Sequence, residues 1–351
     1  MDIIFNFINI INYILQYMKQ FIILFFCASI IFAQNTENNL FSSNDILETK
    51  ISFSTKKLRK SNNDTLYFDT PLMYKVGEEW KEMEIGIRAR GNFRRATCYY
   101  PPVKVDLKKK KAKATLFEGQ KKLKLVLPCK QQADKNDNIL KELMVYKLLE
   151  LVTPYHFKTR RLTIEFTDEN KNKTKVETIN GFFIEDDKKV AKRAEGKVLE
   201  RFIHPMAMDS DASIRNALFQ FMIGNTDFST AYQHNGKLLY SGKKIIPLPY
   251  DFDMSGFINP SYAVVNETLG INNIRDRKYR GFKRADEDFQ KVREDFIAQK
   301  QAMYDLMNSY KADFDNPKEF DEAYTYIESF FEIIEDDSRF QQNILNAART
   351  K

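Results

Sequence analysis

Between residues 47 and 187, apolar and polar residues alternate along several short runs of the chain. In 83–89 and again in 123–127, every second residue is apolar. A period of two residues is typical of strands with one face in a core. The pattern predicts strands in both segments and at 103–107, 162–167 and 181–185. An apolar stripe through Ile139, Leu143 and Tyr146 predicts one amphipathic helix, at 139–151, among them.

From Lys188 onward, apolar residues recur every three or four positions, which is typical of helices. We expect helices at 190–202 and 214–223 and three more at the end of the chain, around 289–310, 320–331 and 340–344. Two short apolar runs, 237–240 and 244–248, flank Ser241-Gly242 and predict a hairpin. The chain is therefore expected to be α+β, with a β-rich part at 47–187, a mostly helical part at 188–351 and a cleft between them.

The first residues of the chain have the pattern of an export signal. Lys19 precedes an apolar run at 21–32, and Ala33 offers a small residue before an expected cut. We predict a signal peptide at 1–33, with Met18 as an alternative start because residues 1–17 carry no basic side chain. A polar linker at 34–46 follows. The protein is expected to be exported to the periplasm, the cell envelope or the medium; the alternative is an uncleaved segment that anchors it to a membrane.

Composition narrows the function classes only slightly. The chain of 351 residues has a formal net charge of +7, which is compatible with phosphate-bearing ligands and with solvated lysines alike. The basic run 108–113 has no interleaved aromatic residues, so we expect no nucleic-acid partner. Cys98 and Cys129 lie outside the signal segment and predict a disulfide, which would stabilise the fold by about 3 kcal/mol. Neither cysteine has a second Cys or His at zinc-ligand spacing.

Candidate catalytic carboxylates flank the expected hairpin, in a segment at 224–256. Asp227 follows the helix that ends at Gly224, and Asp251 and Asp253 follow the second strand. Phosphoryl transfer uses one carboxylate to orient a hydroxyl and another to hold a magnesium ion on the phosphates. The alternative interpretation is that Asp227 caps a turn and the other two are solvated loop charges.

Candidate phosphate-binding residues lie in the β-rich part. Arg90-Gly91-Asn92 ends a strand in an arginine-rich turn, where backbone amides and guanidinium groups can hold an anion; a basic surface hairpin is the alternative. Lys124 is favoured over Lys104 and Lys122 as the strand lysine that reaches phosphates. Glu142 is expected to pair with that lysine, or to form an exposed ion pair of little energetic value.

A basic cluster later in the chain allows two interpretations. Arg275, Arg277, Lys278 and Arg280 follow one another closely. The cluster would either bind an acidic substrate or form salt bridges with Asp276 and its neighbours.

The ordered set of motifs resembles the spore-coat-protein-H (CotH) kinase-like family and, more distantly, the atypical secretory kinases. The motifs are Arg88–Asn92, the Lys-Leu-Lys-Leu strand at 122–125, the helix with Glu142, Gly224–Asp227, His234-Asn235 and Pro249–Asp253. The similarity covers about residues 80–260. It implies a protein-kinase-like two-lobed fold, with a β-rich N-lobe that contains one helix and a mostly helical C-lobe.

The resemblance also implies roles for individual residues. Asp227 would accept the proton of the acceptor hydroxyl, and Asp251, with Asp253 and Asn235, would hold Mg²⁺ or Mn²⁺. Lys124 would bind a phosphate of ATP, oriented by Glu142, while Arg90, Gly91 and Asn92 would cover the phosphates. We expect an exported phosphotransferase that moves the γ-phosphoryl group of ATP to a hydroxyl of an exported protein or a small molecule. The alternative is a catalytically inactive, kinase-like binding module of the cell envelope.

Overall fold

The structure, a computed structural model, describes residues 39–61, 63, 65–91, 93–132, 134–170 and 173–350. The predicted signal peptide at 1–33, the first part of the predicted linker and Asn92 lie outside the described residues.

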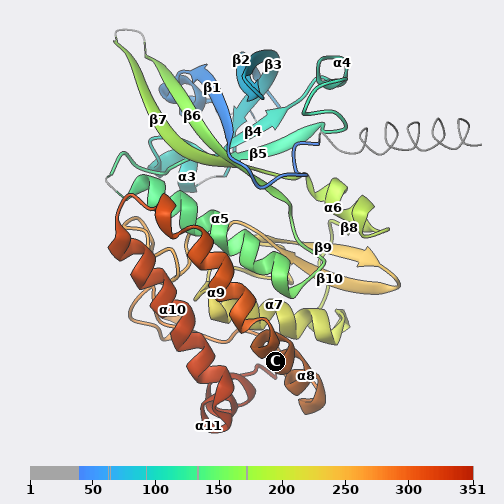
Figure 1. Cartoon of the computed structure of the whole chain (residues 1–351). Coiled ribbons are helices and arrows are strands. Elements are labelled where there is room, and N and C mark those ends of the chain that lie inside the picture. The colour runs from blue at the N-terminus through green and yellow to red at the C-terminus, as the bar shows by residue number, and fades with distance from the viewer. Residues whose placement is uncertain are drawn as a thin grey trace, which may run out of the picture.

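Seven strands form a closed barrel in the order β1-β2-β3-β4-β5-β7-β6 (Figure 1). The barrel closes where β1 pairs with β6 in parallel, from Leu47 opposite Leu162 to Phe53 opposite Asp168. The other neighbouring strands are antiparallel. The strands are β1 (Leu47–Phe53), β2 (Phe68–Val76), β3 (Glu79–Ala89), β4 (Val103–Asp106), β5 (Lys122–Val126), β6 (Thr159–Asn170) and β7 (Lys173–Ile184). Three short helices flank them: α2 (Thr55–Lys60), α3 (Phe93–Thr97) and α4 (Lys109–Ala112).

The closed barrel contradicts the expected two-lobed, protein-kinase-like fold, and that prediction is wrong. The alternating pattern identified residues that face a core, but it carries no information about which strands become neighbours. Closure depends on pairing between β1 and β6, which lie more than a hundred residues apart in the chain. The structure contains both helices and strands, as expected. The arrangement of the strands differs from the expected one.

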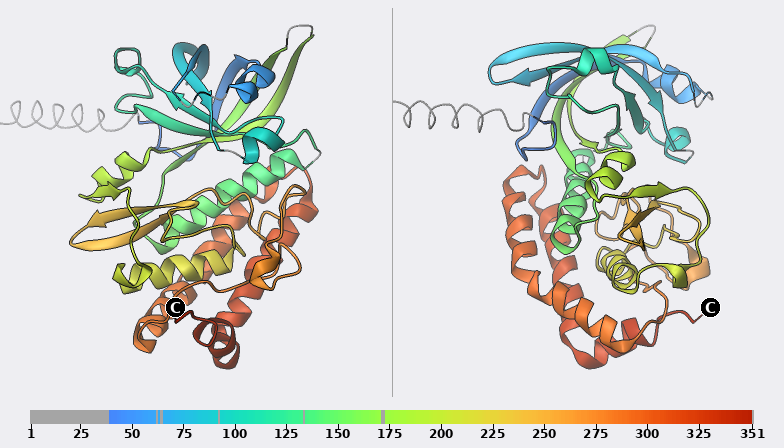
Figure 2. Two further views of the ribbon diagram at one scale, coloured as in Figure 1. Left: turned by 180° about the vertical axis from the view of Figure 1, so that it is seen from behind. Right: turned by 90° about the vertical axis from the view of Figure 1, so that its right-hand side faces the viewer.

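The remainder of the described chain is mostly helical and packs below the barrel (Figures 1 and 2). Its helices are α5 (Lys135–Val152), α6 (Asp187–Arg193), α7 (Ser210–Met222), α8 (Asp286–Ala298), α9 (Lys300–Ser309), α10 (Pro317–Glu335) and α11 (Asp337–Phe340). Short helical turns occur at η1 (Pro205–Ala207), η2 (Glu267–Leu269), η3 (Lys311–Asp313) and η4 (Gln341–Leu345). A second sheet has the order β10-β9-β8, built from β8 (Lys197–Leu199), β9 (Gly236–Ser241) and β10 (Lys244–Pro249).

Two helix predictions need correction. The helix expected at 190–202 ends at Arg193, and the chain then forms β8, because this segment pairs with β9, a tertiary contact that the local pattern does not show. At the junction the Gly196 backbone lies so close to the Tyr240 carbonyl that a Cβ would lie 2.3 Å from its oxygen. The apolar stripe at 289–310 belongs to two helices, α8 and α9, with Gln299 between them.

Two large hydrophobic cores organise the described residues, beside a small cluster of Ile203, Met208 and Leu238. One fills the barrel, with inward-facing side chains such as Ile87, Val105 and Leu125. The other joins α5 to the C-terminal helices and to β7 residues Phe182 and Ile184. Helix α5 is therefore buried on nearly all sides, whereas an amphipathic helix was expected. Within the described residues, no helix combines the length and apolar character that crossing a membrane requires.

Candidate functional site

A cleft of about 1470 Å³ separates the outer face of the barrel from the helical part. The barrel contributes Arg90, Gly91 and Lys124 to its lining, and the opposite wall contributes Asp227, Asn235, Asp251 and Asp253. The structure therefore brings together seven of the predicted site residues. Glu142 lies outside the lining of this cleft, and Asn92 is outside the described residues.

Lys124 projects from the middle of β5 between two aromatic rings. Its Nζ atom lies 4.5 Å from the ring centre of Phe157 and 4.2 Å from that of Tyr250. Such contacts attract a cation to the ring faces. Burial, followed by the charge of Arg90, nevertheless lowers the pKa of Lys124 to about 8. The amine thus lies at the cleft wall, where a bound anion would stabilise its protonated form.

Two arginines approach the acidic pair from the barrel side. Arg90 Nη1 lies 3.6 Å from Asp251 Oδ2. Arg94, on α3, lies between both carboxylates, with Nη1 3.6 Å from Asp251 Oδ1 and Nε 3.4 Å from Asp253 Oδ2. Between them Gly91 has a φ of +69°, a conformation that glycine adopts without strain. Backbone at this turn can therefore approach a ligand closely.

The predicted disulfide between Cys98 and Cys129 is present, and it fixes the position of α3. The Cys98 amide donates to the Arg94 carbonyl at 2.8 Å, and Arg94 Nη2 donates to the Leu127 carbonyl at 3.3 Å. The bridge thus ties the helix that carries Arg94 to the chain that leaves β5.

The carboxylates of Asp251 and Asp253 are positioned by the residue between them. Phe252 is fully buried and packs its ring 4.9 Å from that of Tyr146. The Asp251 amide donates to the Tyr146 hydroxyl at 3.0 Å. Asp251 has a φ of +63°, which is rare for a residue with a side chain and is held here by its neighbours.

The two carboxylates differ in their acidity. Burial opposes ionisation of Asp251, but Arg90 and Arg94 hold its pKa below the ordinary value. Burial raises the pKa of Asp253 to about 6 although Arg94 acts in the opposite direction. At neutral pH both are mainly ionised, and Asp251 is the more acidic of the two.

Glu142 lies behind the cleft, and within the described residues no ion pair joins it to Lys124. Only 2% of its surface is exposed, and its Oε1 atom accepts no hydrogen bond from the described chain. Burial raises the pKa of Glu142 to about 8, while the charge of Arg94 acts to lower it. Its electrostatic partner is an arginine of α3, so the expected pairing with the strand lysine is absent.

Asp227 lies in the loop after α7, and hydrogen bonds hold both of its carboxylate oxygens. His234 Nε2 is 2.9 Å from Oδ1, and Asn235 Nδ2 donates to Oδ2 at 2.9 Å. The same Asn235 amide donates to the Asp227 carbonyl at 2.7 Å. The Asp227 side chain is nevertheless 47% exposed, so one face of the carboxylate remains open to a ligand. The amide nitrogen of Asn235 is engaged with Asp227, which leaves its amide oxygen for a cation.

The basic cluster at 275–280 supports the two acidic loops from behind. Arg277 donates to the carbonyls of Met222 and Tyr326, and Arg280 donates to those of Thr226 and Phe228. Arg277 and Arg280 thus hold backbone carbonyls, while Arg275 forms an ion pair with Glu322, with Nη1 3.7 Å from Oε2. Salt bridging, one of the two interpretations of the cluster, is therefore present for Arg275, and binding of an acidic substrate stays a prediction.

Two glycines let the loops approach each other. The Gly256 amide donates to the Gly224 carbonyl at 3.1 Å, and the Tyr326 hydroxyl lies against both residues. A Cβ on Gly224 would lie 2.0 Å from that hydroxyl oxygen. The loops of Asp227 and of Asp251 are therefore joined directly, backbone to backbone.

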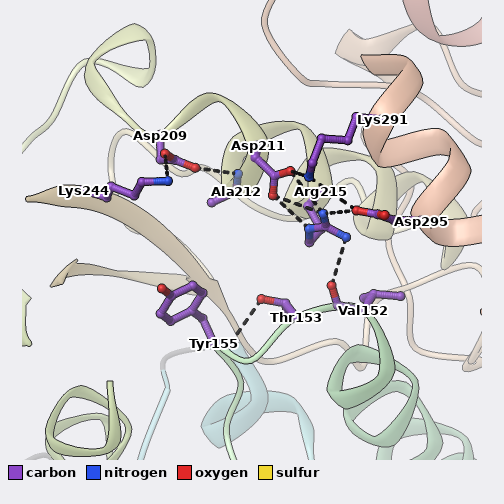
Figure 3. Close-up of polar contacts among 10 residues, drawn as sticks. All are labelled: Val152, Thr153, Tyr155, Asp209, Asp211, Ala212, Arg215, Lys244, Lys291 and Asp295. Carbon is purple, nitrogen blue, oxygen red and sulfur yellow. Dashed lines mark hydrogen bonds and ion pairs between the residues drawn. The ribbon is translucent and has the colours of Figure 1, made fainter. Parts of the chain in front are cut away.

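An ionic network holds α7, the helix that leads to Asp227 (Figure 3). Arg215 pairs with Asp211 on its own helix and with Asp295 on α8, and donates to the Val152 carbonyl at the end of α5. Asp209 caps α7 through the Ala212 amide and pairs with Lys244 on β10. These contacts fix α7 against three other elements.

The acidic pair fits a divalent cation bound together with phosphates. Asp251 Oδ1 and Asp253 Oδ2 are buried and accept no hydrogen bond from the described chain, and Arg94 Nε and Nη1 donate none. Among the described residues, no group of three or more His, Cys, Asp and Glu side chains converges on one point. Mg²⁺ is usually held by one or two carboxylates with substrate phosphates, so this donor set suits it.

Several residues of the site were given no individual role by the sequence pattern. Arg94 belongs to an arginine-rich turn that was noted, but only the fold shows that it lies between Asp251 and Asp253. Of the two residues that enclose Lys124, Phe157 lies in a segment without a recognisable motif, and Tyr250 lies in the motif Pro249–Asp253 but was given no role of its own. His234 was noted beside Asn235, and the fold adds its contact with Asp227.

No protein-family model matches the chain, and no curated protein matches it with significance. The disulfide is compatible with an exported protein. Export itself remains a prediction from the N-terminal sequence.

Proposed function

We propose that the cleft binds a nucleoside triphosphate, of which ATP is the expected one, with Mg²⁺ or Mn²⁺ and transfers its γ-phosphoryl group to a hydroxyl. The observation that carries the proposal is the shared lining of one cleft by Asp227, Asp251, Asp253, Lys124 and Arg90. The proposal rests on these side chains and not on the fold. Membership of the CotH family stays an inference from the motifs.

In the proposed reaction, Asp227 accepts the proton of the acceptor hydroxyl. The acceptor oxygen forms a bond to the γ-phosphorus, the bond from that phosphorus to the β–γ bridging oxygen breaks, and the nucleoside diphosphate leaves with the electron pair. His234 and Asn235 orient the Asp227 carboxylate, which retains lone pairs for the substrate proton.

The remaining residues would bind the triphosphate and its cation. Lys124, Arg90 and the Gly91 backbone would contact phosphate oxygens, while Asp251 and Asp253 would hold the cation. A divalent cation supplies neutralisation of phosphate charge when it is bound. Arg94 already lies beside both carboxylates, so it would exchange part of that contact for a phosphate oxygen.

The test uses the purified protein with labelled ATP, Mg²⁺ or Mn²⁺, and acceptors that include the protein itself. Asp227→Asn and Asp251→Asn should each lower label transfer by about a hundredfold or more, because each removes a group needed at the reacting phosphate. Asp305→Asn, an exposed change on α9, is the matched control. Wild-type transfer that is indistinguishable from both site variants would refute the proposal.

A second candidate is an inactive module that binds nucleotide or another phosphate compound without turnover. The pairing of Asp251 with Arg90 and Arg94 favours it, because a cation must compete with these arginines. A rise in melting temperature with ATP and Mn²⁺, together with no label transfer to any acceptor, would select this function over the first.

A further inference from the structure

The barrel wall of the cleft carries a row of basic residues, of which the proposed transfer uses only Lys124. Arg88 on β3 stands opposite Lys104 on β4, which stands opposite Lys124 on β5. Their chain neighbours, such as Val105 and Leu123, point into the barrel core, so the row faces outward into the cleft. Lys122, two residues before Lys124, lies on the same face because side chains alternate along a strand.

Lys104 and Lys122 meet no fixed counter-ion. Within the described residues, neither forms an ion pair or a side-chain hydrogen bond, although both line the cleft. Lys104 is partly buried, and its pKa is lowered first by that burial and then by the charges of Lys122 and Arg88. Like charges held close together are unfavourable, and a bound anion would relieve the repulsion.

The segment that follows β7 adds charges of both signs to the lining. Lys188, Lys189 and Lys192 on α6 line the cleft together with the carboxylates of Asp186 and Asp187. Those two carboxylates act on Lys104 and Lys124 from a distance, without forming an ion pair with either in the described chain. Lys104 and Lys122 therefore have carboxylates in their surroundings, among them Asp106 opposite Lys122 on β4, but no ion pair with any of them in the described chain.

The cleft has room for more than one ligand. Its volume of about 1470 Å³ exceeds the roughly 300–1,000 Å³ of common small-molecule pockets. A nucleotide bound at Lys124, Arg90 and the acidic pair would leave the region around Lys104 and Lys122 for a second molecule. That molecule is the acceptor if the proposed transfer takes place.

We propose that Lys104 and Lys122, together with Arg88, form a second anion subsite that binds a phosphate monoester on the acceptor, a small molecule that also carries a free hydroxyl. Arg88 and Lys122 lie near the partly buried Lys104, so several cations can contact one ligand group. Such a cluster suits a compact dianion better than an acidic peptide, whose single charges are spaced apart. The identity of the subsite ligand as acceptor rests on the proposed function. The subsite itself does not.

The test measures binding of glucose 6-phosphate, with glucose as the uncharged comparison, by calorimetry on the full protein. The variant Lys104→Gln/Lys122→Gln should bind glucose 6-phosphate about tenfold more weakly or worse, because it loses two charge-assisted contacts. Its affinity for ADP with Mg²⁺ should stay within about twofold of wild type. The control variant Lys109→Gln/Lys110→Gln on α4 removes the same charge at exposed positions outside the cleft.

Each outcome decides the matter. Equal binding of glucose 6-phosphate by wild type and Lys104→Gln/Lys122→Gln, or none by wild type, overturns the subsite. Displacement of glucose 6-phosphate by a hexa-aspartate peptide at lower concentration shows that the ligand class is wrong. Lysine-dependent binding without any transfer from ATP would uphold the subsite and defeat the proposed function. Transfer from ATP, together with unchanged binding of glucose 6-phosphate by Lys104→Gln/Lys122→Gln, would uphold the proposed function and defeat the subsite.

Discussion

Glu142 is an acid in an interior that favours its protonated form. Burial raises its pKa to about 8 from an ordinary value of 4.5. The folded protein therefore binds more protons at this site than the unfolded chain does between these two values. The contribution to stability is complete below about pH 4.5 and is lost as the pH rises through about 8.

We predict that Glu142→Gln makes the stability of the protein less dependent on pH. Between pH 5 and pH 8.5, the wild type should lose on the order of 2 kcal/mol more unfolding free energy than the variant, because only the wild type must ionise a buried carboxyl. Thermal melts across this range measure the difference. Glu78→Gln, at a side chain that is 95% exposed, is the control. Parallel pH profiles for wild type and Glu142→Gln would contradict the prediction.

The pKa of Lys124 gives anion binding a pH dependence of its own. Because burial lowers this pKa to about 8, the amine loses its proton as the pH rises through that value. A phosphate ligand should therefore bind more weakly at higher pH. We predict that the affinity for ADP with Mg²⁺ falls by about tenfold between pH 7 and pH 9.

The variant Lys124→Met should bind the nucleotide weakly and lose this pH dependence, as measured by calorimetry at each pH. Lys109→Met, on α4, should keep the wild-type profile. A wild-type profile as flat as that of Lys124→Met would show that the amine does not contact the ligand.

At the scale of the element, α3 depends on the disulfide that follows it. The helix has five residues, too few to be stable alone, and it carries the arginine that lies between Asp251 and Asp253. Cys98 joins its end to Cys129. The position of Arg94 is thus set by a covalent bond.

We predict that Cys98→Ser/Cys129→Ser lowers the unfolding free energy by about 3 kcal/mol, through the freedom that the unfolded chain regains. It should also weaken binding of ADP with Mg²⁺, because Arg94 is no longer held in place. Thermal melts and calorimetry measure the two effects separately. Lower stability with unchanged nucleotide affinity would show that α3 keeps its position without the bridge.

Most elements could be predicted from the sequence because their signals are local. The alternation around Leu123 and Leu125 predicted β5, and the turn at Ser241-Gly242 predicted the hairpin of β9 and β10. The helix expected at 190–202 was wrong because the pairing of this segment with β9 is a tertiary contact. The predicted pairing of Glu142 with Lys124 was also wrong, because the sequence pattern cannot show that α5 is enclosed on nearly all sides.

At the scale of the whole molecule, the sequence predicted which residues face a core but not how the strands join. Nothing in β1 indicates that it pairs in parallel with β6 and closes a barrel. The gathering of Asp227 and Asp251 in one cleft, by contrast, could be expected, because a short hairpin connects their loops. The residues that complete the cleft, Arg94 and Phe157 among them, come from distant segments and needed the fold.

Helix α5 belongs to the same hydrophobic core as the C-terminal helices and also packs against β7 of the barrel. The two walls of the cleft are therefore joined through a shared apolar core, and swinging them apart would expose the apolar side chains that join them. A ligand would find its charged partners already in position and would lose little affinity to ordering them. We therefore expect selectivity at this site to come from the shape and charge of the entering molecule more than from a closing motion.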